Sequence, residues 1–315
     1  MNDREKNFIS AVVYIFNDEK RIKKFLNMLI DILEENFEHS EIVCVNDCSE
    51  DMSVEYIKQI AAERGKNACM TLLNMSYFHG LEMAMHAGVD MAIGDFVFEF
   101  DSVSLDYDKS EVMRIYRKSL EGFDIVSASP EERGKLTSKV FYYVFDKFSS
   151  MSYKMYTERF RILSRRVINR ISSMNKSVPY RKAVYANCGL KTENIVYSVK
   201  KEFKENKKIE SKEKKYRCHL AIDTLILFTE VGFRISILMT VIMMLMTIFM
   251  AAYSLTTYLT SNPVEGWTTT ILFLSISFFG IFTVFTIIIK YLQILVDLVF
   301  KRKRYSFESI EKLTK

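Results

Sequence analysis

The chain has 315 residues, with 44 Lys or Arg against 39 Asp or Glu, and therefore a formal net charge of +5. This length allows one large domain or two smaller ones. The five cysteines are odd in number and form no CxxC pair, and the four histidines do not stand at metal-ligand spacing, so neither a disulfide framework nor a zinc site is supported.

Over the first 130 residues, short apolar runs alternate with stretches that have a helical pattern. The first run, FISAVVYIF at 8–16, is rich in β-branched and aromatic residues, and the helical pattern at 21–36 follows it. The later expected elements alternate in the same way: strands at 41–45, 69–74, 96–100 and 123–129, and helices at 53–64 and 80–93. The sequence therefore predicts an α/β domain with a mostly parallel sheet.

Polar clusters follow three of the expected strands. They are Asn17-Asp18-Glu19, the stretch from Asn46 to Asp51, and the run that starts at Asp101 in GDFVFEFDSVSLDYD. In such sheets ligands bind beyond the carboxyl ends of the strands. Crowded carboxylates indicate a divalent cation and a phosphorylated ligand, although they also end ordinary strands and cap helices. Because three acidic clusters share one rim, we expect this rim to be functional.

Two long uncharged runs follow this domain, from Ile235 to Val264 and from Gly266 to Ile289. Each is longer than the about 20 residues that a helix needs to cross a bilayer core of about 30 Å. We expect two transmembrane helices, at about 235–259 and 267–289, joined as a hairpin by a short link.

Basic residues give the expected orientation of this hairpin. Arg234 precedes it, Lys290 and the KRKR run at 301–304 follow it, and the link carries only Glu265. Basic residues favour the cytoplasmic side, so both termini and the N-terminal domain are expected on that side of the plasma (inner) membrane. The first residues, MNDREKNF, contain no apolar signal-peptide core, which agrees with a domain that is not exported.

The segment 199–217 carries nine Lys or Arg residues against four acids. A solvated helix face would explain it, but its place just ahead of the first expected span favours contact with anionic lipids, at about 1 kcal/mol per basic residue. Nucleic acid is not an expected partner for a membrane-tethered domain whose basic segment has no interleaved aromatic platform.

Five stretches, in this order, resemble the family-2 glycosyltransferases of the polyprenyl-phosphate type, which include dolichyl-phosphate mannose synthase and bacterial undecaprenyl-phosphate glucosyltransferases. The stretches are AVVYIFNDE, EIVCVNDCSEDMS, FHGLEMAMHAGVDMAIGD, RFRILSRRVINRI and HLAIDTLILFT. The resemblance covers essentially the whole chain. It implies a cytoplasmic GT-A (Rossmann-like) domain at 1–198, a basic juxtamembrane segment at 199–234, the transmembrane hairpin at 235–289 and a basic cytoplasmic tail at 290–315.

The resemblance also implies a nucleotide-sugar donor, a polyprenyl-phosphate acceptor, Mg²⁺ or Mn²⁺, and transfer with inversion; a homo-oligomer is one alternative for the assembly. Residues expected to contact the base and ribose of the donor share the two first polar clusters: Asn17, Glu19, Asp47, Ser49 and Asp51. Two positions depart from the family pattern there, since Asn46 replaces an aspartate and Cys48 a glycine.

The expected metal site is incomplete. Asp101 aligns with the first carboxylate of the family's D-A-D-L-Q motif, but Val103 takes the second position, and valine cannot ligate a cation. Either Asp101 holds the metal with phosphate and water, or Asp106 or Asp108 substitutes, or no metal binds. Arg159 stands where the family has an acid.

Three family arginines persist as candidates for binding the acceptor or the diphosphate: Arg161, Arg165 and Arg181. Guanidinium groups bind phosphate through two hydrogen bonds, although a surface ion pair would also explain any one of them.

Two hypotheses follow. The first is a membrane-bound glycosyltransferase that makes a polyprenyl-phosphate sugar for cell-envelope glycans, with Asp101, Arg161, Arg165 and Arg181 in the catalytic site and Asp101 with Asp106 as metal ligands. The second is a catalytically weakened membrane scaffold or regulator that binds nucleotide, lipid or a partner without turnover.

Overall fold

The computed structural model describes residues 4–64, 69–131, 158–173, 180–200, 211–228, 267–300 and 305–314, with isolated residues between 235 and 249. The chain divides into two compact units. The first contains Met1–Asp146, Met151–Ala221 and Arg302–Lys315, and the second contains Lys147–Ser150 and Ile222–Lys301.

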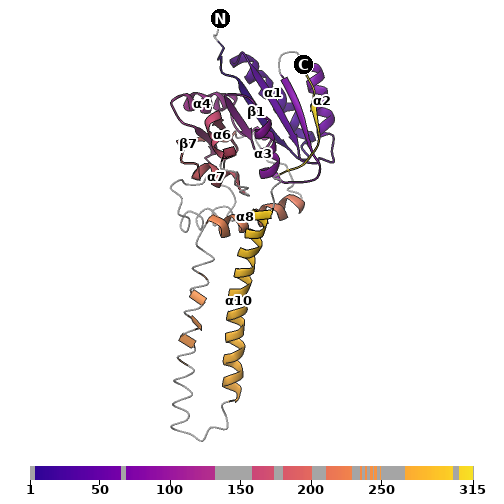
Figure 1. The fold of residues 1–315 in the computed structure, drawn as a ribbon. Helices are drawn as coiled ribbons and strands as arrows, with labels where there is room; N and C mark the ends of the chain where they lie inside the picture. Colours follow the sequence, from indigo (N-terminus) through magenta and orange to yellow (C-terminus); the bar gives the residue numbers. More distant parts are fainter. Residues whose placement is uncertain are drawn as a thin grey trace. The chain divides into compact units, whose positions relative to one another are not determined.

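The first unit is built on one eight-stranded sheet with the strand order β7-β5-β6-β4-β1-β2-β3-β8. Figure 1 labels β1 and β7 of this sheet. The strands β3, β2, β1 and β4 run parallel to one another, and β5 runs parallel to β7. β6 is antiparallel to both of its neighbours, and β8 is antiparallel to β3. The mostly parallel sheet is therefore confirmed. The strand bounds are β1 Ile9–Ile15, β2 Ser40–Asn46, β3 Cys69–Met75, β4 Phe96–Phe100, β5 Ile125–Pro130, β6 Phe160–Ser164, β7 Thr192–Tyr197 and β8 Phe307–Lys312.

Helices cover both faces of this sheet. α1 (Glu19–Asn36), α2 (Ser53–Arg64) and α4 (Lys109–Leu120) contribute to one hydrophobic core, and α3 (Leu81–Met91), α6 (Arg165–Ser173) and α7 (Arg181–Asn187) contribute to the other. Alternate residues of β1 divide between the two cores, with Val13 in the first and Val12 in the second. Because both faces are covered, all seven residues of β1 are buried, which explains why Ser10 is the one polar residue in its otherwise apolar run.

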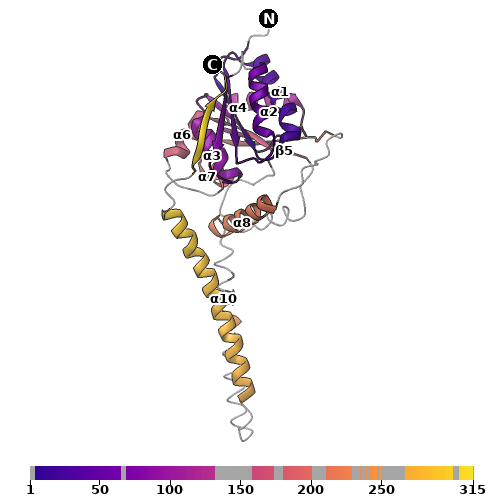
Figure 2. The same ribbon diagram turned by 90° about the vertical axis from the view of Figure 1, so that its right-hand side faces the viewer.

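The C-terminal strand differs from the expectation for the tail. Residues 290–315 were expected to form a basic cytoplasmic tail, whereas β8 pairs with β3 and extends the sheet at its edge (Figure 2). The sequence FESIEK has no apolar run to mark it as a strand, because its side chains lie at an exposed edge. Its backbone pairing with β3 and its side-chain contacts hold it in place.

The remaining helices are α8 (Ser211–Phe228) and α10 (Trp267–Phe300). Within the second unit, Lys290 of α10 forms an ion pair with Asp223 of α8 at 3.0 Å. Most of the first expected span, 235–259, lies outside the described residues, and the second expected span falls within α10. Among the residues that the structure describes, no helix meets the length and apolarity required to cross a membrane. The transmembrane hairpin therefore stays a prediction.

Candidate active site

The loops that follow β1 and β2 are joined by hydrogen bonds. The backbone N–H of Asn17 donates to Ser49 Oγ at 3.1 Å, and Glu50 N–H donates back to Asn17 Oδ1 at 2.8 Å. Glu19 N–H donates to Asp51 Oδ2 at 2.9 Å, which links the start of α1 to the second loop. The structure thus brings together the two polar clusters that were expected to contact the donor.

Two residues in these loops have a left-handed backbone. Asn17 has φ +50° and Cys48 has φ +62°. Asparagine tolerates this region, but a cysteine Cβ is crowded there, whereas glycine adopts it without steric cost. The local geometry therefore explains why the family pattern has a glycine at the position that Cys48 occupies.

Asp47 is fully buried, and its carboxylate organises the entry to α3. Oδ1 accepts the His79 backbone N–H at 2.8 Å, and Oδ2 accepts the Gly80 N–H at 2.8 Å and the Tyr14 hydroxyl at 3.0 Å. Burial raises the pKa of Asp47, and the hydrogen bonds from His79, Tyr14 and Gly80 oppose that rise. Asp47 therefore holds the loop before α3, and a contact with a nucleotide stays a prediction.

The departure at Asn46 has a structural reason. Its Nδ2 donates to Asn74 Oδ1 on the neighbouring strand β3 at 2.9 Å, while its Oδ1 accepts the Ser49 N–H at 3.0 Å. An ionised aspartate can only accept hydrogen bonds, so it could not donate to Asn74. The amide at 46 thus fits this chain's β3.

Asp101, directly after β4, lies between two guanidinium groups. Arg161 of β6 contacts Asp101 Oδ2 through Nη2 at 2.7 Å, and Arg181 of α7 contacts Oδ1 through its Nη2 at 2.8 Å. Burial acts to raise the pKa of Asp101, but the charges of Arg161 and Arg181 outweigh it and lower the pKa to about 2. Asp101 is therefore an anion with a guanidinium on each oxygen.

A second layer of buried acids lies behind this pair. Glu99 contacts Arg161 Nη1 at 2.8 Å and Arg181 Nη1 at 2.7 Å, and accepts the Tyr185 hydroxyl at 2.7 Å. Glu82 pairs with Arg181 Nε at 3.0 Å. Glu158 lies 3.1 Å from Arg161 Nε. We call this group the arginine–acid cluster: Glu82, Glu99, Asp101, Glu158, Arg161, Arg181 and Tyr185.

Sequence analysis missed Glu82, Glu99 and Tyr185 as members of the cluster. Glu99 left a visible signal, because it is the only charged residue in the otherwise apolar strand FVFEF. A buried charge needs a partner, so this glutamate predicts an arginine or lysine facing it from another element. No comparable local pattern marks Glu82 or Tyr185.

Arg165 lies at the other end of β4. Its Nε donates to the carbonyl of Gly94 at 2.9 Å, and its Nη2 donates to the carbonyl of Ala92 at 2.8 Å. Gly94 precedes β4 and Asp101 follows it, so the five residues of that strand, at about 3.3 Å each, separate the two sites. The structure does not bring Arg165 to the arginine–acid cluster, and its role in phosphate binding stays a prediction.

Asp106 and Asp108, the two acids that could have replaced the missing carboxylate at position 103, have structural roles. Asp106 is buried and pairs with Arg159 Nε at 3.2 Å, so the arginine that replaces the family's acid meets a carboxylate. Asp108 caps α4, because its Oδ1 accepts the Ser110 N–H at 3.0 Å. Hydrogen bonds from Ser110 lower the pKa of Asp108.

These side chains do not fit a divalent cation held by two carboxylates. Val103 is buried, both oxygens of Asp101 face guanidinium groups, and Asp106 faces Arg159. Within the described ranges, no group of three or more His, Cys, Asp or Glu residues is placed to hold a metal ion. Positive charge at Asp101 comes from arginine in this arrangement.

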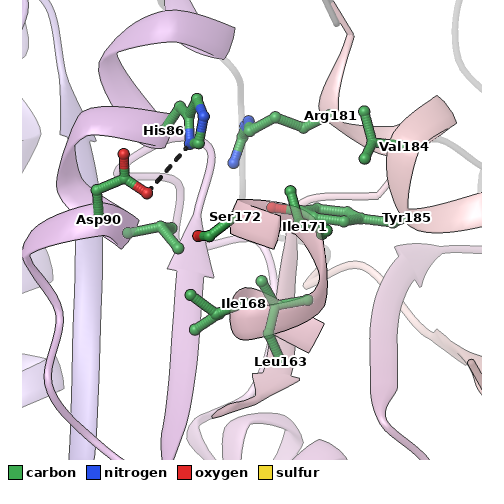
Figure 3. A pocket seen from close by; sticks show the side chains of 10 residues that line it. His86, Asp90, Leu163, Ile168, Ile171, Ser172, Arg181, Val184 and Tyr185 are labelled. Atoms are coloured by element: carbon green, nitrogen blue, oxygen red, sulfur yellow. Dashed lines mark ion pairs between the residues drawn. The ribbon is translucent and has the colours of Figure 1, made fainter. Parts of the chain in front are cut away.

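A small cavity borders the arginine–acid cluster between α3, α6 and α7 (Figure 3). Arg181 and Tyr185 line one side, and His86 and Asp90, whose Nδ1 and Oδ1 atoms are 3.7 Å apart, line another. Its volume of about 30 Å³ has room for water but not for a nucleotide sugar.

Comparison with known proteins decides the family. The profile described as Glycosyl transferase family 2 matches residues 10–172, which is more than half of the chain and includes both loops, Asp101 and Arg161. The chain belongs to glycosyl transferase family 2. Its α/β domain with a mostly parallel sheet agrees with the expected GT-A-like fold.

Similar proteins carry glycosyltransferase names. An uncharacterized glycosyltransferase of Synechocystis sp. is 27% identical over 201 residues, covering 62% of each chain. A prophage bactoprenol glucosyl transferase homolog of Escherichia coli is 29% identical over 195 residues, covering 60% of this chain and 62% of its own. An undecaprenyl-phosphate 4-deoxy-4-formamido-L-arabinose transferase of Aeromonas hydrophila is 28% identical over 133 residues, covering 42% and 40%. The matches thus span less than two thirds of these relatives.

Among solved structures, glucosyl-3-phosphoglycerate synthase from Mycobacterium tuberculosis, determined with Mn²⁺, UDP-glucose and phosphoglyceric acid, is similar to this chain with a TM-score of 0.49. The sequence identity is 14%, and the match covers 70% of this chain and 79% of that one.

Proposed function

We propose that this protein is a membrane-bound glycosyltransferase that moves a sugar from a nucleotide-sugar donor to a polyprenyl (undecaprenyl) phosphate at the cytoplasmic leaflet, for cell-envelope glycans. The observation that carries the proposal is the family match over residues 10–172, which includes two interlocked loops and Asp101 at the carboxyl ends of β1, β2 and β4. This is the rim at which α/β sheets bind ligands. The names of the bactoprenol and undecaprenyl-phosphate relatives support the acceptor class.

The proposed reaction needs little proton transfer. A phosphate oxygen of the acceptor attacks the anomeric carbon of the sugar, and the bond from that carbon to the nucleoside diphosphate breaks, with inversion. Because the acceptor is already an anion at neutral pH, a strong general base is not required. The main demand is to stabilise the negative charge that develops on the departing diphosphate.

Cationic side chains around Asp101 are the candidates for that stabilisation. Arg161 and Arg181 are held in fixed orientations, and Lys182 adds a third positive charge that acts on Asp101. The arginine–acid cluster holds four carboxylates against two guanidinium groups, so Arg161 and Arg181 neutralise and orient the buried acids rather than bind the diphosphate. Lys182, whose charge acts on Asp101, is the candidate for stabilising the charge on the diphosphate.

The proposed membrane location rests on the two uncharged runs and on the place of the C-terminus. β8 joins the sheet of the N-terminal domain. The chain therefore leaves this unit after Ala221 and returns to it at Arg302. A hairpin with both ends on the cytoplasmic side satisfies this connection. The exposed side chains of Lys214, Lys215 and Arg217 on α8 provide charge for anionic lipids, while Tyr216 packs against Phe78, with ring centroids 5.9 Å apart.

A specific observation favours the second candidate, a domain that binds without turnover. Both acids that were expected to hold a metal are paired with arginine: Asp101 with Arg161 and Arg181, and Asp106 with Arg159. A scaffold that has lost transfer activity would retain these ion pairs as structural elements.

Calorimetry of UDP and GDP binding to the detergent-purified chain, with Mn²⁺, Mg²⁺ or EDTA, separates the candidates. The transferase proposal expects micromolar to millimolar binding of one nucleotide, followed by sugar transfer from that donor to undecaprenyl phosphate. A folded protein that binds neither nucleotide would reject the transferase and favour the scaffold. Binding that requires Mn²⁺ or Mg²⁺ would show that the cation arrives with the nucleotide, since the protein ligands alone do not fit one.

A further inference from the structure

The C-terminal strand contacts the candidate donor site through side chains. β8 pairs with β3 from Thr71 opposite Lys312 to Met75 opposite Phe307, and it forms the outer edge of the sheet (Figure 2). The ends of the segment are held as well, since Met70 N–H donates to Thr314 Oγ1 at 2.7 Å and the Tyr305 hydroxyl donates to Asp90 at 3.0 Å.

One route from this strand runs through Asn74. Asn74 Nδ2 donates to Ser309 Oγ at 3.0 Å and to Glu311 Oε1 at 3.1 Å, both on β8. The other amide atom, Oδ1, accepts from Asn46, which in turn accepts the backbone N–H of Ser49. A single planar amide therefore connects the C-terminal strand to the loop after β2.

A second route runs through His79. The backbone N–H of Ser306 donates to His79 Nε2 at 3.2 Å, and the backbone N–H of His79 donates to Asp47 Oδ1 at 2.8 Å. Asp47 is the residue next to Asn46, so both routes reach the same loop. Two independent contacts converge on the loop that carries Asn46, Asp47 and Ser49.

We propose that the C-terminal segment 305–314 is part of the donor site, with Asn74 and His79 as positioning residues that hold the 46–49 loop in its nucleotide-binding geometry. The proposal rests on the proposed function for its ligand, a nucleoside diphosphate. Because this segment follows the second expected span, the donor site is complete only after the chain has returned to the N-terminal domain. Donor binding thereby depends on completion of the hairpin.

The test variants change the amide of Asn74 to a carboxylate and then the carboxylate of Glu311 to an amide. Asn74→Asp keeps the acceptor for Asn46 but places a carboxylate against Glu311, so β8 loosens and the nucleotide affinity falls about tenfold. Adding Glu311→Gln to this variant supplies an amide donor to the new carboxylate at position 74, so the double variant recovers to within twofold of the wild type. Glu308→Gln, at an exposed position on β8, makes the same charge change as Glu311→Gln and controls for net charge.

Two measurements are made on each full-length variant in detergent: calorimetry with UDP and GDP, and hydrogen exchange of the 46–53 peptide without ligand. The proposal expects faster exchange in this peptide for Asn74→Asp, with recovery in the double variant. The exchange of α1 reports global folding, so a variant that has simply unfolded is recognised.

The outcomes distinguish the two proposals. Unchanged exchange in 46–53 for a folded Asn74→Asp variant would overturn the positioning role, whatever the nucleotide result. Altered and rescued exchange without any nucleotide binding to the wild type would support the coupling of β8 to the loop and reject the donor. If Asn74→Asp alters the exchange of 46–53 and lowers nucleotide affinity, and the double variant recovers both, the coupling of β8 to the loop and the donor site are both supported.

Discussion

Arg181 places its guanidinium Nη2 2.8 Å from Oδ1 of Asp101, the acid that the sequence marked as the first metal ligand. Arg161 faces the other oxygen, so the charge that a cation would supply at this carboxylate is supplied by side chains from β6 and α7. The energetic consequences of this arrangement can be measured.

Replacing Asp101 with Asn is expected to destabilise the protein by about 2 kcal/mol and to abolish any metal-dependent nucleotide binding. The free energy follows from the lowering of the pKa from 3.8 to about 2, at about 1.4 kcal/mol per pKa unit. Thermal unfolding in detergent and calorimetry measure the two effects. Asp108→Asn is the control, because asparagine caps a helix as well as aspartate does. Full affinity in a folded Asp101→Asn variant would contradict the site assignment.

The stabilisation from Asp101 should depend on pH in one direction. Because its pKa is lower in the folded protein, its contribution is fully present above about pH 4 and is lost as the pH falls through about 2. The difference in stability between wild type and Asp101→Asn should therefore shrink between these values. A difference that instead grows on acidification would show that Asp101 is protonated in the folded state.

Cys48→Gly is expected to stabilise the domain by about 0.5–1 kcal/mol. The φ of +62° crowds a side chain, and glycine removes that cost of about 1–2 kcal/mol, less the extra entropy that it gives the unfolded chain. Cys48→Ala keeps the Cβ and should leave the stability almost unchanged. Equal effects of the two substitutions, measured by thermal unfolding, would locate the change in the thiol rather than in the backbone.

Arg165→Gln should lower stability by about 2 kcal/mol without changing nucleotide affinity. The guanidinium donates to the carbonyls of Ala92 and Gly94, at the end of β4 remote from Asp101, and charged hydrogen bonds contribute about 1.5–3 kcal/mol. The side chain of Arg166 is 69% exposed, so Arg166→Gln is the matched control and should have little effect on stability. A selective loss of affinity for Arg165→Gln would restore its predicted role in phosphate binding.

Asp106 and Arg159 should behave as one structural pair. Asp106→Asn and Arg159→Gln are each expected to destabilise, and the double variant should cost less than the sum of the two, with a coupling of about 2 kcal/mol. The double-mutant cycle is measured by thermal unfolding with and without Mn²⁺. A coupling that appears only with Mn²⁺ would return Asp106 to the metal site.

The local sequence was sufficient for the five strands and three helices expected over the first 130 residues and for the polar rim, whereas α4, β6, α6, α7 and β7 were not among the expected elements. Strands and helices differ in the period of their apolar residues, and this signal is contained in short windows such as 8–16 and 21–36. The polar residues after β1, β2 and β4 follow directly from the chain order, because parallel strands end at the same edge. β8 escaped this reasoning because an exposed edge strand needs few apolar residues.

The partners of Asp101 depend on contacts over long sequence separations. Arg161 and Arg181 lie 60 and 80 residues further along the chain, and no local pattern joins them to Asp101. The antiparallel register of β6 against β4 sets Arg161 opposite Glu99 and Ser164 opposite Phe96, which carries Arg165 to the far end of the strand. Composition and motifs thus identify the charged residues, while strand direction and register determine which carboxylate each arginine meets, since an ion pair forms only where the fold brings its two groups within a few ångströms.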